Sequence, residues 1–312
     1  MKRFKVTVLA ALAGIILVTV PRASSQPPAG GPPAPGTFNM RGNAVPFDFN
    51  DNEGFTSLFD GKTLNGWAGH PQLWSVKDGA IYIHPSCEHP TGTTYMYWTG
   101  GEATDFVLKY ELKGNQNVNG GMQFRSYLTA DANASGKFPP RPARGPAGGA
   151  GRGPGGAAGA GRGPGGGGGR GRGPACENPG TPPSREELAP WDMFGPQADF
   201  DANNNFSGMF YEQGGRAIIA LPGHALLAEK GRVQDLGTIA DKEMMQSWFH
   251  KDDYNQFMIV AKGPTTSIFM NGHLITVLTD NDPTYFRPGG KLGPEVESTG
   301  EYWVRNIYLK KL

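Results

Sequence analysis

The sequence predicts an all-β fold, an antiparallel β-sandwich or jelly roll. Three observations support this: many short segments alternate apolar and polar residues, turn signals recur at close intervals, and strands do not alternate with helices as a parallel sheet requires. Only residues 241–249 (DKEMMQSWF) have the pattern of a helix. Antiparallel sandwiches often bind their ligand on a concave sheet face.

The expected strands follow one another from the first tryptophan-rich segment to the C-terminus. Asp78-Gly79 and Asn271-Gly272 are dipeptides that favour tight hairpin turns. In residues 120–128, Gln123, Arg125 and Tyr127 alternate with apolar neighbours, which places Arg125 on a polar face. The predicted elements are the hairpins 74–83 and 267–278 and the strands 105–113, 120–128, 254–261 and 302–309.

The N-terminus has the features of a secretory signal peptide. Basic residues precede an uncharged apolar run at 6–20, and small residues follow it, so cleavage is expected after Ser25. The apolar run is too short to span a bilayer comfortably. We therefore expect a periplasmic or secreted protein that has no membrane contact once the signal is removed.

The rest of the chain is expected to be a single domain with two low-complexity segments. Residues 26–45 form a Pro/Gly-rich lead, and residues 46–312 form the β-sandwich, interrupted by a disordered Gly/Arg/Pro-rich insertion at about 141–183. Gly-x-Gly-x-x-Gly spacings inside this insertion lack the strand and helix that a dinucleotide site needs. An Arg-Gly run in an exported protein is better explained as a solvated loop than as an RNA-binding segment.

The net charge of +1 conceals an acidic folded body. Ten of the 29 basic residues lie in the signal and at 141–172 of the insertion, two spans that hold no Asp or Glu, so 19 remain against 28 acidic residues, an excess of nine negative charges. An acidic body argues against nucleic acid as a partner.

Cys87 and Cys176 are the two cysteines of the chain. An even number in an exported protein indicates one disulfide, with two free thiols as the alternative. Neither cysteine has a histidine partner in a recognisable catalytic signature, which argues against a thiol nucleophile.

The segment from Trp191 to Arg216 has the densest polar chemistry in the sequence. As a strand, it places Gln197 and Asp199 together on one face. A turn at 201–205 and a strand at 206–212 predict a hairpin, which returns Glu212 to the neighbourhood of Asp199 if the register allows. Two carboxylates and an amide on one surface suit acid/base chemistry on a polar substrate.

The same segment has the acid and amide spacing of a calcium loop. Asp201, Asn203, Asn205, Ser207 and Glu212 occupy the ligand positions. Phe206 stands where such loops need glycine, and no helices flank the segment. A hairpin turn is the favoured interpretation, with no cofactor expected and calcium as the weaker alternative.

Several blocks of sequence resemble a known family. They include residues 55–67 (FTSLFDGKTLNGW), 74–80 (WSVKDGA), 119–125 (NGGMQFR), 195–199 (GPQAD), 269–272 (FMNG) and 304–307 (VRNI). Together they resemble the 3-keto-disaccharide hydrolase domain, which is built on a concanavalin A-like lectin/glucanase sandwich. Many members have a Leu-Gln-x-His strand where this chain has residues 291–297 (KLGPEVE).

The resemblance implies hydrolysis of 3-keto-glycosides that another enzyme has oxidised. A ketone at C3 acidifies the proton on C2, so a base removes it, the glycosidic oxygen leaves from C1, and water adds to the product. This route needs a base, an acid and a hydrogen-bond donor for the enolate oxygen. The candidates are the acid/base pair Asp199 and Glu212 and the substrate-binding residues Arg125, Gln197, Tyr211 and Arg216.

Two other functions compete with this one. A non-catalytic, lectin-like carbohydrate-binding module would use the same face without turnover, and Asp199, Glu212 and Arg125 would then be ordinary solvated or paired side chains. A retaining endoglucanase of the same fold usually shows a Glu-x-Asp-x-x-Glu strand, which this sequence lacks.

Overall fold

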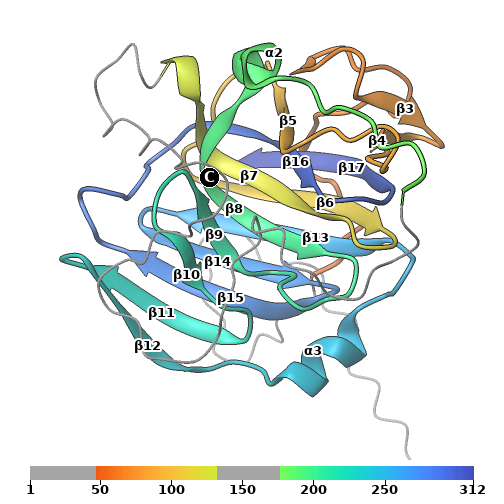
Figure 1. Cartoon of the computed structure of the whole chain (residues 1–312). Coiled ribbons are helices and arrows are strands. Elements are labelled where there is room, and N and C mark those ends of the chain that lie inside the picture. Colours follow the sequence, from red (N-terminus) through yellow and green to blue (C-terminus); the bar gives the residue numbers. More distant parts are fainter. Residues whose placement is uncertain (1–46, 132–175) are drawn as a thin grey trace, which may run out of the picture. The chain divides into compact units, whose positions relative to one another are not determined.

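A computed structural model describes residues 47–131 and 176–312, which fold as two stacked β-sheets (Figure 1). The predicted all-β sandwich is confirmed. The expected signal, the Pro/Gly-rich lead and residues 141–175 of the insertion lie outside the described residues. Among the residues that are described, no helix is long and apolar enough to cross a membrane.

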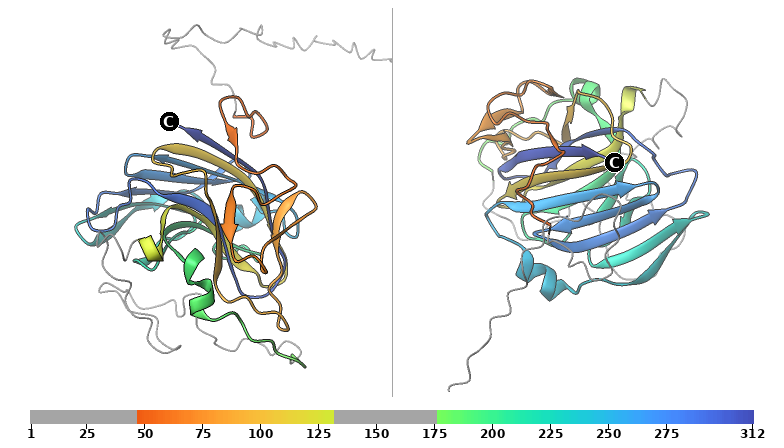
Figure 2. Two further views of the ribbon diagram at one scale, coloured as in Figure 1. Left: turned by 90° about the horizontal axis from the view of Figure 1, so that it is seen from above. Right: turned by 180° about the vertical axis from the view of Figure 1, so that it is seen from behind.

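The larger sheet has ten strands and faces the viewer in the right-hand panel of Figure 2. β1 (Thr56–Ser57) pairs with β17 (Tyr302–Lys311) but lies outside the linear order of the other strands. The other strands follow in the spatial order β12 (Arg232–Thr238), β11 (His224–Glu229), β15 (His273–Asp280), β14 (Thr265–Met270), β13 (Asn255–Lys262), β6 (Phe106–Gly114), β17 (Tyr302–Lys311), β4 (Ala80–Ile83) and β3 (Ser75–Lys77).

The second sheet has seven strands. Their spatial order is β10 (Ala217–Ala220), β9 (Phe210–Gln213), β8 (Met193–Asp201), β7 (Asn119–Leu128), β16 (Lys291–Glu297), β5 (Thr94–Trp98) and β2 (Trp67–Gly69). Neighbouring strands in both sheets are antiparallel, with one exception: β11 lies parallel to β15.

Local signals in the sequence explain the tight turns. Asp78 and Gly79 have φ of 53° and 75° between β3 and β4, and Asn271 and Gly272 have φ of 50° and 81° between β14 and β15. These positive angles match the right-handed twist of the flanking strands, which is why Asn-Gly and Asp-Gly are favoured there. Both predicted hairpins are confirmed.

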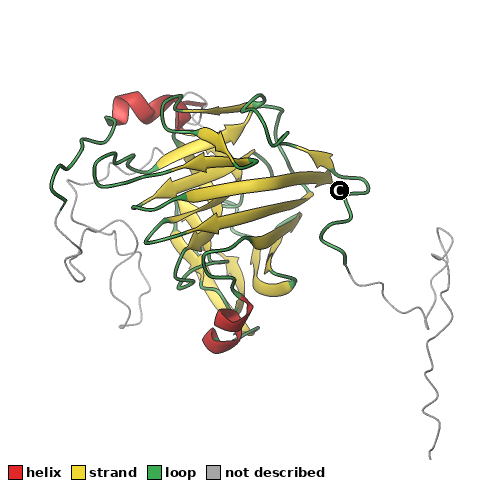
Figure 3. Ribbon diagram, turned by 90° about the vertical axis from the view of Figure 1, so that its right-hand side faces the viewer, coloured by secondary structure: helices red, strands yellow, loops and turns green. Residues whose placement is uncertain are grey.

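The helices are short and lie at the periphery (Figure 3). α3 (Lys242–Trp248) is the predicted helix, and it begins where the Asp241 side chain accepts a hydrogen bond from the Met244 amide. The sequence interpretation missed α2 (Arg185–Leu188) and the 3-10 turn η1 (Ala189–Trp191). α2 begins with a capping box between Ser184 and Glu187, a signal that the sequence does contain.

Aromatic side chains interlock between the two sheets. Phe200 of β8 packs edge-on against Tyr302 of β17 and Phe257 of β13, with ring centroids 6.2 and 6.3 Å apart. Phe124 of β7 packs in the same way against Phe106 of β6 at 6.4 Å. These contacts fix which face of each sheet is inside, and therefore which face carries the polar residues.

The outer face of β6 differs from the solvated face that its alternation predicts. Lys109 and Glu111 are 0% and 8% exposed. The Lys109 ammonium donates to the carbonyls of Phe49 and Asp51 and to Asn52, so the segment before β1 covers this strand. Alternation reports the face of a strand but not what else folds over it.

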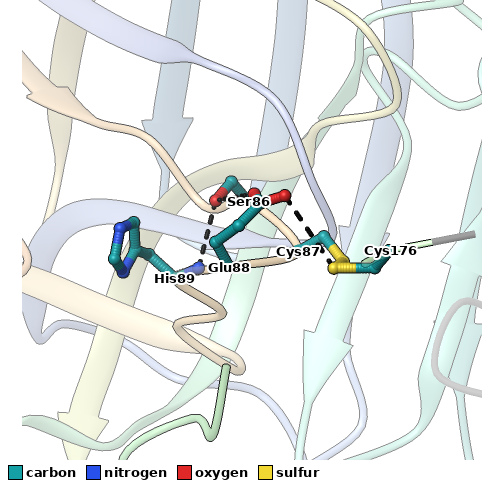
Figure 4. The surroundings of a disulfide bond; sticks show 5 residues. All are labelled: Ser86, Cys87, Glu88, His89 and Cys176. Carbon is teal, nitrogen blue, oxygen red and sulfur yellow. Dashed lines mark hydrogen bonds between the residues drawn. A yellow bond between two sulfur atoms is a disulfide. The ribbon is translucent and has the colours of Figure 1, made fainter. Parts of the chain in front are cut away.

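Cys87 and Cys176 form a disulfide, with their Cα atoms 6.1 Å apart (Figure 4). The Gly180 amide also donates to the Cys87 carbonyl at 2.9 Å. These two bonds hold residues 176–180 against the loop between β4 and β5.

Candidate functional site

A row of buried polar side chains lies on the outer face of the seven-stranded sheet. Gln197 and Asp199 come from β8, Gln123 from β7 and Glu295 from β16; their exposures are 3%, 4%, 0% and 4%. Gln123 lies opposite Gln197, while Asp199 and Glu295 lie on either side of Gly121. Residues opposite one another share a face, so the four project together, away from the core. We call them the acid–amide row.

Hydrogen bonds join three members of the row and a serine into a chain. Ser126 Oγ donates to Gln123 Oε1 at 2.7 Å, and Gln123 Nε2 donates to Gln197 Oε1 at 2.7 Å. Gln197 Nε2 then donates to Glu295 Oε2 at 2.8 Å and lies 3.5 Å from Asp199 Oδ1. Buried amides bonded at both ends hold one orientation.

Gly121 leaves the space that this chain occupies. A Cβ built at Gly121 would lie 2.6 Å from Gln197 Nε2 and 2.5 Å from the Ala198 carbonyl oxygen. A side chain at position 121 would therefore displace the amide of Gln197. The glycine is needed here for close approach, not for backbone freedom.

Asp199 is the member of the row whose protonation is most strongly perturbed. Burial raises its pKa well above the usual 3.8, and the nearby charges of Glu297 and Asp201 raise it further. Desolvation and like charges both disfavour the carboxylate. Asp199 is therefore a carboxylic acid over a wider pH range than an exposed aspartate, so it is able to donate a proton.

Arg125 does not lie on the polar face where alternation predicts it. β7 has one extra residue between Gln123 and Tyr127 relative to both neighbouring strands, and Arg125 has φ of 47°. This β-bulge turns Arg125 towards the ten-stranded sheet, where it donates to the carbonyls of Thr104 and Gly263 and pairs with Asp105. Ser126 takes the outward position instead.

Glu212 lies on the opposite face from Asp199, so the predicted acid/base pair is wrong. In the register of β8 and β9, Glu212 is opposite Pro196, whereas Tyr211 is opposite Gln197. The second strand of the hairpin begins at Phe210, later than the expected Phe206. Tyr211, which is half-buried, and Gln213 are the residues of β9 that share the face of the row.

Glu212 and Arg216 instead belong to a buried ion cluster between the sheets. Arg216 Nε lies 2.8 Å from Glu212 Oε2, and Arg216 Nη2 lies 2.5 Å from Asp280 Oδ2 on β15. The Arg216 guanidinium also lies 4.7 Å from the centroid of the Tyr285 ring. The predicted substrate-binding role of Arg216 has no support in this position, because the cluster ties β9 to the other sheet.

The loop after β8 accounts for the spacing that resembles a calcium site. The Asp201 carboxylate accepts hydrogen bonds from the amides of Asn203 and Phe206 and from the Asn205 side chain. Glu212 faces the core. In the described part of the chain, the sole grouping of metal-ligand type is Cys87, Glu88 and Cys176, and its two sulfurs are bonded to each other.

Sequence reasoning missed Gln123 and Glu295 as members of the site. The segment Lys291–Glu297 does carry a signal, since Leu292, Pro294 and Val296 alternate with polar or small residues as in a half-buried strand. The stretch where many family members have a histidine therefore contributes a carboxylate in this chain.

Comparison with known proteins gives one family and several partial likenesses. The 3-keto-alpha-glucoside-1,2-lyase-like domain matches residues 54–148 and 177–310. A 3-keto-disaccharide hydrolase of Bacteroides thetaiotaomicron is 31% identical over an alignment of 91 residues that covers 23% of this chain and 27% of that protein. The chain thus spans about a quarter of the length of this curated relative.

Solved structures with related sandwiches are more distant in sequence. A Parabacteroides distasonis protein put forward as a glycosyl hydrolase is 15% identical, with a TM-score of 0.42 over 83% of this chain and 94% of that one. A Bacillus subtilis protein with a galectin-like fold is 10% identical, with a TM-score of 0.43 over 80% and 90% of the two chains.

Proposed function

Because this chain belongs to the family of the 3-keto-alpha-glucoside-1,2-lyase-like domain, a carbohydrate-active family, we propose that it cleaves 3-keto-glycosides with the acid–amide row as its active site. The proposed reaction is elimination followed by hydration. The curated relative is named a 3-keto-disaccharide hydrolase, which supports a disaccharide as one substrate. The proposed location is the periplasm or the exterior of the cell, as the N-terminal sequence predicts.

The reaction balances with one acid and one base in the row. The base takes the proton from C2 to give an enolate stabilised by the C3 oxygen; the C1–O bond then breaks, and Asp199 protonates the departing oxygen. Water next adds its hydroxyl to C1, its proton returns to Asp199, and the base returns a proton to C2. Both groups end in their starting states, and the net change is hydrolysis.

The observation that carries the proposal is the raised pKa of Asp199 beside a carboxylate and two amides. A leaving oxygen needs a proton donor, and burial beside acidic neighbours favours the protonated form of the Asp199 carboxyl. Tyr211, on the same face one strand away, is the proposed donor to the enolate oxygen.

The test is turnover of a 3-keto-glucoside by the purified mature protein in D2O. In elimination and hydration the base holds the C2 proton between the two steps, so deuterium appears at C2 of the released 3-keto sugar when the protonated base exchanges with D2O; direct hydrolysis leaves C2 unlabelled. Incubation without enzyme corrects for exchange next to the ketone. Asp199→Asn is expected to lower the rate by roughly 100- to 10,000-fold, the usual effect of losing a general acid.

Asp78→Asn is the matched control, since the same substitution in the turn between β3 and β4 keeps a residue suited to positive φ. It should retain the wild-type rate. Binding of the keto-sugar without release of product would instead support the non-catalytic carbohydrate-binding module. An unchanged rate in Asp199→Asn would remove Asp199 from the mechanism.

A further inference from the structure

We infer that Glu295 is the base that takes the C2 proton, and that Gln197 positions it by lying across Gly121. This inference rests on the proposed function, which leaves the base unassigned. Three features carry it: the direction of the hydrogen-bond chain, the reach of Gln197 over β7, and the placement of two unlike acids on either side of one glycine.

The chain of hydrogen bonds ends at the Glu295 carboxyl group. Gln197 presents its Nε2 to Glu295 Oε2 and its Oε1 to Gln123, and a hydrogen bond donated to a carboxyl oxygen favours the ionised form. Gln123 must then present Nε2 to Gln197, and its Oε1 is left to accept from the Ser126 hydroxyl. Each group donates towards Glu295, so the whole chain favours the charged form of that carboxylate.

The reach of Gln197 depends on the missing side chain of Gly121. β8 and β16 are separated by β7, and two strand spacings amount to about 10 Å. A glutamine of β8 meets an acid of β16 only by lying flat over the strand between them. It does so at Gly121, where an added Cβ would fall 2.6 Å from its amide nitrogen.

Asp199 and Glu295 are both opposite Gly121 in the sheet register, one on each side. The amide nitrogen of Gln197 lies 2.8 Å from Glu295 Oε2 but 3.5 Å from Asp199 Oδ1. Glu295 therefore receives the shorter hydrogen bond from Gln197, which favours its charge, while at Asp199 burial and the neighbouring acids outweigh the backbone hydrogen bond from Phe200. Such a difference in surroundings separates a base from an acid.

The experiment uses Glu295→Gln and Gln197→Met in the full mature chain. Glu295→Gln should lower kcat by roughly 100- to 10,000-fold, as expected for loss of a general base. Gln197→Met keeps the length of the side chain but removes its donor. Losing a hydrogen bond to the carboxylate raises the pKa of the base. The acidic limb of the pH profile of kcat/KM should therefore move to higher pH by about one to two units.

Ser126→Ala gives a second, more distant test of the same chain. It removes the first donor and leaves Gln197 in place, so the limb should move in the same direction by a smaller amount. A purely structural role for Ser126 would change the melting temperature without moving the limb. Gln234→Met, an exposed glutamine of β12, is the matched control and should leave the profile unchanged.

A readout without turnover separates this inference from the proposed function. In protein labelled with carboxyl-13C glutamate, the Glu295 resonance is identified by its loss in Glu295→Gln and then titrated by NMR. Its midpoint should rise in Gln197→Met. Wild type without turnover but with this shift would refute the proposed function and leave the positioning intact. The inference would be overturned if Glu295→Gln kept its turnover. It would also be overturned if Gln197→Met left both the acidic limb of the pH profile and the titration midpoint of Glu295 unchanged.

Discussion

Arg216→Met tests whether the cluster of Glu212, Arg216 and Asp280 is structural. The substitution keeps much of the side-chain volume but removes the ion pairs that Arg216 makes with two carboxylates at the boundary between the sheets. Arg287 remains near enough to act electrostatically on both, but the short contacts to Arg216 are lost. The side chains of Glu212 and Asp280 are 2% and 8% exposed, and that of Arg216 is 16% exposed. Water therefore cannot replace the lost partner well.

The expected loss of stability in Arg216→Met follows from the burial of these side chains. Removing one partner of a buried ion pair typically costs about 3 to 5 kcal/mol, because the remaining charge stays desolvated. For a domain of this size the melting temperature falls by about 2 to 4 °C per kcal/mol, which gives a drop of roughly 6 to 20 °C.

The assay is urea denaturation followed by tryptophan fluorescence, with the turnover rate measured below the melting temperature. Lys77→Met is the matched control: its partner is Glu301, the two side chains are 44% and 23% exposed, and its loss should lower the stability far less than Arg216→Met does. The folded Arg216→Met protein should retain its turnover rate. A variant of wild-type stability with lost turnover would refute our reasoning and return Glu212 and Arg216 to the active site.

Three further predictions concern the acid, the disulfide and the buried lysine. Because folding raises the pKa of Asp199, its burial costs stability above that pKa, and the free energy of unfolding should rise as the pH falls through the folded value. In denaturation curves recorded from about pH 8 to 4, Asp199→Asn should weaken the dependence of the free energy of unfolding on pH. An unchanged dependence in this variant would contradict the prediction. Replacing Cys87 and Cys176 with serine opens a link between residues 89 apart and should cost about 4 to 5 kcal/mol in urea denaturation, and a loss below about 1 kcal/mol would contradict the chain-entropy argument. Lys109→Met removes the hydrogen-bond donor of the Phe49 and Asp51 carbonyls. It should lower the free energy of unfolding by about 1 to 3 kcal/mol and speed amide hydrogen exchange at residues 49–55. Exchange at the wild-type rate would show that other contacts hold this segment.

Features fixed by neighbouring residues could be predicted from the sequence. Asp78-Gly79 and Asn271-Gly272 specify their turns because few residues tolerate positive φ at both positions, and Asp241 specifies the start of α3 by capping it. Gln197 and Asp199 share a face because side chains alternate along any strand. Each of these statements needs only a few consecutive residues.

Features that depend on register between strands could not be predicted. The loop between Asp201 and Phe210 is longer than the tight turn assumed, and a shift of one residue decides which face Glu212 takes. The row itself joins β7, β8 and β16, and Glu295 of β16 is 98 residues from Gln197 of β8 in the sequence. No local pattern brings Glu295 next to Gln197.

The β-bulge in β7 shows why these failures are linked. One inserted residue turns Arg125 inward, where its guanidinium binds the carbonyls of Thr104 and Gly263, and the same insertion turns Ser126 outward to begin the hydrogen-bond chain. A non-glycine residue at φ of 47° is held there at a cost, and the bonds of Arg125 to the other sheet offset it. Without those bonds the strand favours regular alternation, which would return Ser126 to the core side. Arg125 therefore supports the acid–amide row from behind, and loss of activity on its substitution would not show that it contacts the sugar.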